Sequence, residues 1–301
     1  MFFSFDTKKE GKKGDVFLQT RTDLAWEAAE KCIETEGLNR REWEESGVHF
    51  SRLTISKEAE AVLEKPAGEY LTASLPPLTD HEEELENIAS VLGKVLRECL
   101  PPSGTVLVVG LGNRAITPDA LGPLTAGHVL ATRHIRGEFA RSAGLDDLRP
   151  TAVITPDVLG NTGIESSETV AGVCRMIHPC AVIAVDALAA KSLERLGCTV
   201  QLSDSGIAPG SGVGNNRRAL CREQLGVPVI GLGVPTVVDA ATVARELTGA
   251  EQECIAPHGT AMMVTPREVD LMVERASRLL AMTIHVALQP GYSPLELLSL
   301  A

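Results

Sequence analysis

Two short stretches of this chain share one pattern, in which a Thr-Pro-Asp turn follows an apolar run. Residues 116–122 read ITPDALG and follow TVLVVGLGN, whereas residues 154–160 read ITPDVLG and follow PTAV. A third acidic residue, Asp186, directly follows the apolar run AVIAV. Asp119, Asp157 and Asp186 are therefore the first candidates for catalytic side chains.

Asp119 and Asp186 form the pair that could do acid–base chemistry. If the apolar runs before them are neighbouring parallel strands, both carboxylates lie at the same edge of one sheet, where such sheets carry their active sites. Two close carboxylates cannot both ionise at low cost, so one keeps its proton near neutral pH and the pair offers an acid and a base. This arrangement suits the activation of water against an amide carbonyl. The alternative is that each Asp caps a helix that follows its strand.

The second copy of the pattern is interpreted as structural. Asp157 follows a weaker apolar run and reads as a turn or cap residue. Glu165 ends the NTGIE turn and stands where the next helix would begin, where the helix dipole favours a negative charge. Asp157 could still change the pKa values of a nearby acidic pair.

Two glycine-containing turns could bind a phosphate, but neither has the full pattern. The loop PGSGVGNN at 209–216, which includes Gly212 and Gly214, has no P-loop lysine and no GxGxxG register. The turn GLGN, which ends at Asn113, is no stronger as a nucleotide signal. A tight turn that lets another part of the chain approach closely explains such glycines better.

Other catalytic or metal-binding patterns are weak. His178 and His258 stand alone, the cysteines show no CxxC spacing, and no GxSxG nucleophile motif occurs. The sequence therefore predicts neither a metal site nor a bound cofactor.

The composition sets limits on the class of protein. The chain has 301 residues, of which 44% are apolar and 3% aromatic, so its core must consist of Val, Leu, Ile and Ala. The net charge of −12 argues against nucleic acid as the main partner. Seven cysteines and no recognisable signal peptide indicate a cytoplasmic protein. No apolar run reaches about 18 residues, so no membrane span is predicted.

Strands and helices are predicted to alternate along most of the chain. Strands are expected at 48–56, 105–111, 152–155, 181–185, 198–203 and 227–234. Helices are expected within 22–36, from a Thr79/Glu82 capping box to Cys99, and at 166–177, 217–226 and 265–287. Residues 66–77 read as a turn-rich link, and the residues after 186 read as helix or turn. This order predicts a three-layer α/β/α fold with a largely parallel sheet.

Several strings in chain order resemble the spore germination protease family of endospore-forming bacteria. They are GLGNRAITPDALGP, TGIESSETVAGV, VIAVDALAAKSLERLG, DSGIAPGSGVGNNRRAL, VPVIGLGVPTVVDAATV and MMVTPREVD. The resemblance implies an atypical aspartic endopeptidase of the spore core that degrades small acid-soluble spore proteins, works as a homotetramer and needs no cofactor.

The resemblance also implies roles for individual residues. The two catalytic aspartates of the family map onto Asp119 and Asp186, so the first ITPD copy is the catalytic one. Supporting roles are assigned to residues in the matched strings, namely Asn113, Thr117, Glu165, Gly212 and Gly214.

An N-terminal leader follows from the same resemblance. The family is made as a zymogen and cuts after an acidic residue that precedes an apolar residue and Ala. The stretch RTDLAWE fits this rule, so we expect self-cleavage between Asp23 and Leu24, a propeptide at 1–23 and a single peptidase domain at 24–301. The alternative is that this stretch only begins a helix, with Thr22 or Asp23 as its cap.

Two other readings stay open. GLGNRAITPDALG is also similar to hydrogenase maturation peptidases, whose fold is expected to be similar and in which equivalent acidic residues and a His bind a metal. No His can be assigned to that position here. A dinucleotide-binding module built on GLGN and PGSGVGNN is the remaining alternative.

Overall fold

The computed structural model describes residues 22–30, 35–80, 84–135, 137–142, 144–210, 218–249 and 262–301. Within them, nine strands form one sheet in the order β1-β2-β3-β7-β8-β6-β4-β5, and β9 pairs with β8. The strands are β1 (Leu38–Glu45), β2 (Val48–Ile55), β3 (Gly68–Ser74), β4 (Val106–Gly110), β5 (Thr151–Ile154), β6 (Ala181–Ala190), β7 (Thr199–Ser203), β8 (Val229–Asp239) and β9 (Met263–Val264).

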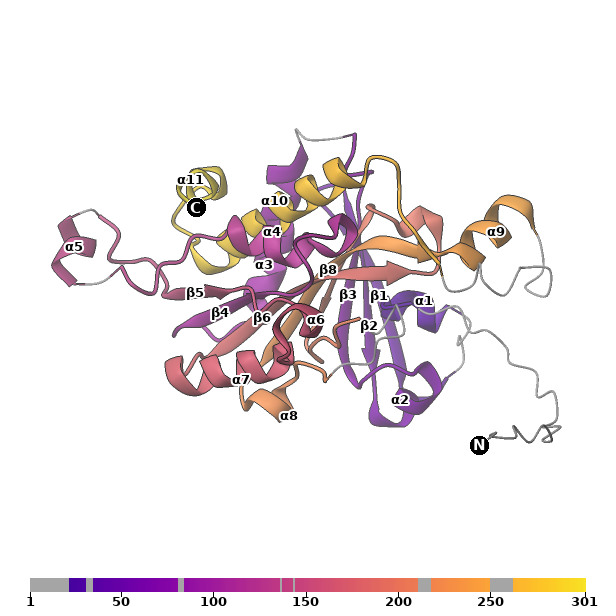
Figure 1. Ribbon diagram of the computed structural model, residues 1–301, viewed down its shortest axis with the longest axis horizontal. Coiled ribbons are helices and arrows are strands. Elements are labelled where there is room, and N and C mark those ends of the chain that lie inside the picture. Colours follow the sequence, from indigo (N-terminus) through magenta and orange to yellow (C-terminus); the bar gives the residue numbers. More distant parts are fainter. Residues whose placement is uncertain are drawn as a thin grey trace, which may run out of the picture.

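Helices cover both faces of this sheet (Figure 1). The α-helices are α1 (Ala25–Ala29), α2 (Lys57–Leu63), α3 (Leu85–Glu98), α4 (Leu121–Gly127), α5 (Gly137–Ser142), α6 (Leu159–Thr162), α7 (Ser166–Ile177), α8 (Arg222–Leu225), α9 (Ala240–Thr248), α10 (Val269–Leu288) and α11 (Pro294–Leu300). Two short 3₁₀ helices are η2 (Thr117–Asp119) and η3 (Leu193–Arg195). The predicted α/β class with helices on both faces is confirmed.

The sheet was predicted to be largely parallel, but it is mixed, because only one of its halves is parallel. Strands β5, β4, β6 and β8 run parallel, whereas β7 is antiparallel to β8 and β3, and β1–β2–β3 form an antiparallel meander. The prediction of a link at 66–77 is wrong, because β3 lies there. Sequence reasoning also missed β1, whose LNRREWEE sequence is mostly exposed at the sheet edge and has no apolar alternation.

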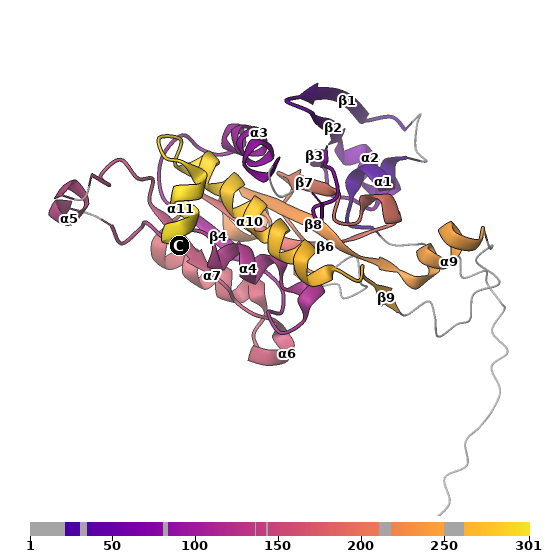
Figure 2. The same ribbon diagram turned by 90° about the horizontal axis from the view of Figure 1, so that it is seen from above.

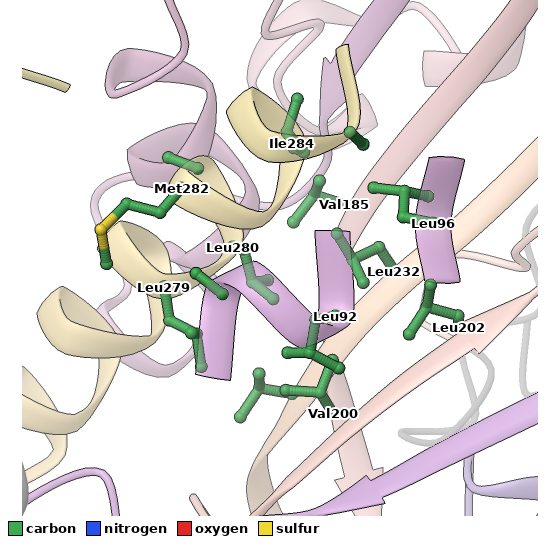
Figure 3. Packing of buried hydrophobic residues seen from close by; sticks show 14 of the residues in the cluster. Leu92, Leu96, Val185, Val200, Leu202, Leu232, Leu279, Leu280, Met282 and Ile284 are labelled. Carbon is green, nitrogen blue, oxygen red and sulfur yellow. The ribbon is translucent and has the colours of Figure 1, made fainter. Parts of the chain in front are cut away.

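Alternating apolar residues divide the central strands between two cores. Val106 and Val108 of β4 face the core under α3 and α10, whereas Leu107 and Val109 face α7. Figure 3 shows the first core, where Leu92 and Leu96 of α3 lie among side chains of the sheet and α10. Each such buried side chain contributes about 1.5–3 kcal/mol of transfer free energy. Figure 2 shows α10 lying across the central strands.

The end of β6 departs from the sequence prediction in a way that matters for function. A strand was expected at 181–185 with helix or turn after it, but β6 continues to Ala190. The continuation ALAA has helix-forming residues, yet β8 pairs with β6 as far as Ala190, opposite Val238. Tertiary pairing therefore overrides local propensity.

Several helix ends also differ from prediction. Helix α3 begins at Leu85, and Thr79 hydrogen-bonds Asp80 instead, while Glu82 lies outside the described residues. Helix α10 begins at Val269 with Glu268 as its N-cap residue, and the Thr265 hydroxyl donates to the Thr236 carbonyl.

Four further helix predictions are kept or corrected. Helix α10 ends at Leu288, close to the expected 287, and α7 has its predicted bounds. Only Arg222–Leu225 is helical in the described part of 217–226, and α1 covers a short part of 22–36.

In the part of the chain that the structure describes, no helix is both long and apolar enough to cross a membrane.

His285 of α10 should make stability depend on pH. Its Nε2 accepts the Leu130 N–H at 3.0 Å, and burial lowers the His285 pKa from 6.5 to about 4. Below about pH 6.5 the imidazole of His285 takes up a proton in the unfolded chain but not in the folded chain. The free energy of unfolding is therefore unaffected by His285 above that pH and falls as the pH is lowered towards 4. The expected loss is about 3 kcal/mol.

Urea unfolding at pH 7 and pH 4 measures this loss. His285→Gln keeps an acceptor for the Leu130 N–H but does not titrate, so its stability should fall by about 3 kcal/mol less than that of the wild type. Equal losses in the two proteins would assign the pH dependence to other groups.

Candidate active site

Asp119 lies in η2, just beyond the carboxyl end of β4. Its Oδ2 accepts the backbone N–H of Asn113 at 2.8 Å, so the carboxylate turns back against the GLGN turn. The turn needs a glycine at Gly112, where φ is +111° and a Cβ would lie 2.1 Å from the Asp119 carbonyl oxygen. Helix α4 has Ala120 as its N-cap with no side-chain cap, so Asp119 is not a cap for this helix.

A side-chain hydrogen bond from β8 holds the helix η2 against the sheet. The Thr236 hydroxyl of β8 donates to the Pro118 carbonyl at 2.7 Å. Thr117 begins η2, and its carbonyl accepts the Ala120 N–H at 3.1 Å. Asn113 thus contributes its backbone N–H to Asp119, while its side-chain Oδ1 accepts the Ala115 N–H at 2.9 Å.

Asp186 lies inside β6 and not at its end. Its side chain is 5% exposed, and Oδ1 accepts the Ala187 N–H at 2.9 Å. Because the strand continues beyond it, the alternative that Asp186 caps a helix is wrong. The neighbouring strands are β4, which pairs Gly110 with Val185, and β8, which pairs Gly233 with Asp186.

The strands that carry the two aspartates are neighbours, as the sequence analysis required. Strands β4 and β6 are parallel, and the Leu111 N–H donates to the Val185 carbonyl at 2.8 Å where the chain leaves β4. The η2 helix that carries Asp119 contacts both β6 and β8. Both carboxylates therefore belong to the same end of the parallel half of the sheet.

A cleft opens on the α7-facing side of β8. We call it the β8 cleft; its walls include Asp23, Lys65, Tyr70, Asp186, Gln201 and Ser203. Its floor includes Gly233, where a Cβ would lie 2.6 Å from the Asp186 carbonyl oxygen. Sequence reasoning placed this glycine within an apolar strand and missed its role. Glycine inside a strand is the available signal for a close approach.

In the segment 22–25, Asp23 forms part of the wall of the β8 cleft. The Asp23 N–H donates to the Ala189 carbonyl at 2.9 Å, and the Ala189 N–H donates to Asp23 Oδ2 at 2.8 Å. Leu24 is fully buried in a small apolar cluster with Leu188, Ala190 and Val238. The N-cap of α1 is Leu24, so neither Thr22 nor Asp23 caps that helix. Asp23, the acidic residue of the predicted cleavage site, therefore lines the same cleft as Asp186.

Gln201 of β7 holds this segment from the other side. Its Nε2 donates to the Asp23 carbonyl at 3.1 Å, and its Oε1 accepts the Ala25 N–H at 2.7 Å. Gln201 was not among the residues predicted for the site. A glutamine at an inward position of an otherwise apolar strand, TVQLS, is the signal that could have found it.

Buried charges surround the segment. Lys65 Nζ donates to the Thr22 carbonyl at 2.7 Å, and burial lowers the Lys65 pKa while the Asp23 and Glu27 charges oppose that shift. Glu27 is 2% exposed and accepts the backbone N–H groups of Lys191 and Ser192. Burial raises the Glu27 pKa above its ordinary value of 4.5.

The second ITPD copy and the remaining candidates lie apart from this cleft. Asp157 has φ +62°, and its Oδ1 accepts the Val158 N–H at 2.7 Å and the Asn161 amide at 3.0 Å, which is the local turn role expected for it. Glu165 is the N-cap residue of α7, at the positive end of that helix, without a side-chain cap bond.

Three of the sequence candidates cannot be placed. Gly212, Gly214 and His258 lie outside the described residues. Within the described ranges, no three His, Cys, Asp or Glu side chains are grouped so that they could hold a metal ion.

Comparison with known proteins gives one consistent family. The family model described as germination protease matches residues 17–250. The germination protease of Caldanaerobacter subterraneus subsp. tengcongensis is 40% identical, over 94% of this chain and 98% of that protein. The germination protease of Bacillus pumilus is 43% identical over 76% of this chain and 66% of that protein.

A solved structure is also similar, though weakly. It is a NiFe hydrogenase maturation protease from Thermococcus kodakarensis KOD1, with 18% identity and a TM-score of 0.37. The likeness covers 63% of this chain and 98% of that chain. A score this low supports no argument about function.

Proposed function

We propose a function for this chain on the premise that it belongs to the germination protease family, as the comparisons show. It is therefore a protease. The finer proposal is that it is an aspartic endopeptidase, made as a zymogen, whose substrates are small acid-soluble spore proteins. We further propose that it works without a cofactor, as a homotetramer in the spore core.

The observation that supports the proposal is that Asp23, the acidic residue of the proposed cut site, and Asp186 line the same cleft. The segment has the order acidic, apolar, Ala that the family resemblance implies for a cut site, and its Asp23 lines the β8 cleft together with Asp186. A site that receives its own cut sequence accounts for both self-processing and cleavage of other chains.

The chemistry we propose is general acid–base catalysis by Asp119 and Asp186. The ionised member of the pair takes a proton from a water molecule, which attacks the carbonyl carbon before the scissile bond. The protonated member gives its proton to the leaving nitrogen, so the C–N bond breaks and the pair returns to its singly protonated state. The pair titrates as a unit, so no proton is assigned to one member.

Self-processing supplies the direct test. We expect the purified chain, incubated at about pH 5, to acquire Leu24 as its new N-terminus, measured by N-terminal sequencing. The processed chain should cut a small acid-soluble spore protein after Glu or Asp before an apolar-Ala pair, measured by mass spectrometry. A different new N-terminus would reject the propeptide at 1–23. Cutting that stops with a chelator would favour the metal-dependent alternative.

Glu27 should make self-processing faster in acid. Because its pKa is raised, the Glu27 carboxyl holds its proton more tightly when the segment is docked than when Glu27 is exposed to water. Docking of the segment is therefore favoured at low pH and weakened as the pH rises through the raised pKa. Among the described residues, the charged groups that interact with Glu27 include Arg195, Glu30 and Lys65.

Glu27→Gln carries a neutral side chain at every pH and tests this point. We expect its self-processing rate to change less between pH 5 and pH 7.5 than the wild-type rate does, with faster processing than wild type at pH 7.5. Glu58→Gln, an exposed change in α2, serves as the control. A Glu27→Gln profile that matches the wild type would assign the pH dependence to other groups.

A further inference from the structure

Gln201 contacts the backbone on both sides of one peptide bond. Its Nε2 donates to the Asp23 carbonyl oxygen, and its Oε1 accepts the Ala25 N–H. These two backbone groups flank the Asp23–Leu24 bond, and the Asp23 carbonyl is the one that hydrolysis of this bond would attack. Gln201 is 7% exposed; its hydrogen bond to the Ala25 N–H is buried, and its hydrogen bond to the Asp23 carbonyl is partly buried.

The strand register places Gln201 opposite Asp186. Asp186 of β6 pairs with Gly233 of β8, and Gly233 pairs with Gln201 of β7. Residues paired directly across a sheet point to the same face, and two strand spacings separate the outer Cα atoms by about 10 Å. Gly233 has no side chain, so the space between the carboxyl group and the amide stays open for a peptide.

The other polar groups of this wall are engaged with one another. Ser203 Oγ lies 2.6 Å from Ser205 Oγ, which donates to the Tyr70 hydroxyl at 2.8 Å. The Tyr70 hydroxyl in turn donates to the Pro66 carbonyl at 2.7 Å. This chain of hydroxyl groups lines the cleft, while the Gln201 amide reaches the Asp23 carbonyl.

We propose that Gln201 is a third catalytic residue, whose side-chain amide stabilises the negative charge that develops on the oxygen of the scissile carbonyl. This inference rests on the proposed function, in which the Asp23–Leu24 bond is cut. As water adds to the carbonyl carbon, the C=O π electrons move to the oxygen and strengthen the hydrogen bond from Nε2. The Gln201 proton stays on its nitrogen throughout, and the Oε1 bond to Ala25 fixes the amide in the donating orientation.

The Gln201 amide would stabilise a negative charge that is present on the carbonyl oxygen only during the reaction. Donors of this kind act mainly on the rate constant of the chemical step, because the ground-state carbonyl needs them less than the transition state does. Removal of one such donor lowers kcat by about 10²–10³-fold in other enzymes.

Gln201→Glu tests the proposal with almost no change in size. In its ionised form the Glu keeps an acceptor for the Ala25 N–H but presents an oxygen, and no donor, to the carbonyl. Gln201→Met removes both hydrogen bonds without adding a charge, so it remains informative if the buried Glu impairs folding. Gln224→Glu makes the same chemical change at an exposed position of α8 and is the matched control.

The experiment measures two reactions. Self-processing of each full-length chain is followed at about pH 5. Each chain is then matured with immobilised wild-type enzyme, and kcat and KM are measured on a peptide that contains TDLAWE. We expect kcat to fall by about 10²–10³-fold in both Gln201 variants, with KM changed by less than about threefold, and no change in Gln224→Glu.

Two other outcomes are distinguishable from this one. If Gln201 only anchors the N-terminal segment, the variants self-process slowly but cut the peptide with the wild-type kcat, which overturns the inference and leaves the proposed function standing. If the wild-type chain cuts neither itself nor the peptide, the proposed function fails, and the role of Gln201 fails with it.

Discussion

Asp119→Asn and Asp186→Asn should each stop both self-processing and the cleavage of substrate. Asn has nearly the shape of Asp but neither takes nor gives a proton at working pH, so either change removes one half of the proposed acid–base pair. We expect both rates to fall by at least about 10⁴-fold, because groups that act as a unit lose most of their effect when one is removed. Rates are measured by the appearance of the Leu24 N-terminus and by peptide cleavage.

Asp157→Asn is the control for these changes, because it alters the same ITPD pattern at the second copy. Asn is tolerated in the left-handed region that Asp157 occupies, and its side chain can keep the local turn bonds. Its activity should stay within about twofold of wild type. The double variant at Asp119 and Asp186 should be no slower than either single variant. Full activity in either single Asn variant would reject the two-aspartate mechanism.

Gly112→Ala should disable the enzyme although residue 112 takes part in no chemistry. The new Cβ would lie 2.1 Å from the Asp119 carbonyl oxygen, and the residue would have to keep φ +111°, which L residues rarely adopt. Relief of this clash has to move Asp119, and a displacement of about 1 Å costs roughly 100-fold in rate. The strain should also lower the free energy of unfolding by about 1–3 kcal/mol.

Gly160→Ala separates this effect from a general cost of replacing glycine. Gly160 lies in α6, and a Cβ there would meet no atom within 4 Å. This control should keep wild-type activity and stability, measured by peptide cleavage and by urea unfolding. If Gly112→Ala keeps wild-type activity while it loses stability, the position of Asp119 does not limit the reaction.

The two ITPD copies show how far a local pattern can be interpreted. Both follow an apolar strand and both lead into a short helix, so the residues alone do not separate them. The structure places β4 between β6 and β5, whereas β5 pairs with β4 at the end of the sheet order. Asp119 therefore follows a strand that borders β6, while the Asp157 carboxylate is used within its own turn.

What the sequence determined by itself is the set of buried strands and the acidic residues next to them. The runs at 106–110 and 181–185 are apolar because both of their faces are buried, and this burial leaves a signal in each segment. Asp119 and Asp186 could be singled out for the same reason, because a charged residue stands out next to such a run.

Only the tertiary structure decided which polar groups meet. The extension of β6 to Ala190, the existence of β3 and the alignment of Asp186, Gly233 and Gln201 all depend on pairing between segments far apart in the chain. A glutamine in TVQLS and a glycine in VIGLG are unusual in their own segments, but neither segment indicates which group the residue meets. Their free energy of interaction arises only when three strands come into register, so no local pattern records it.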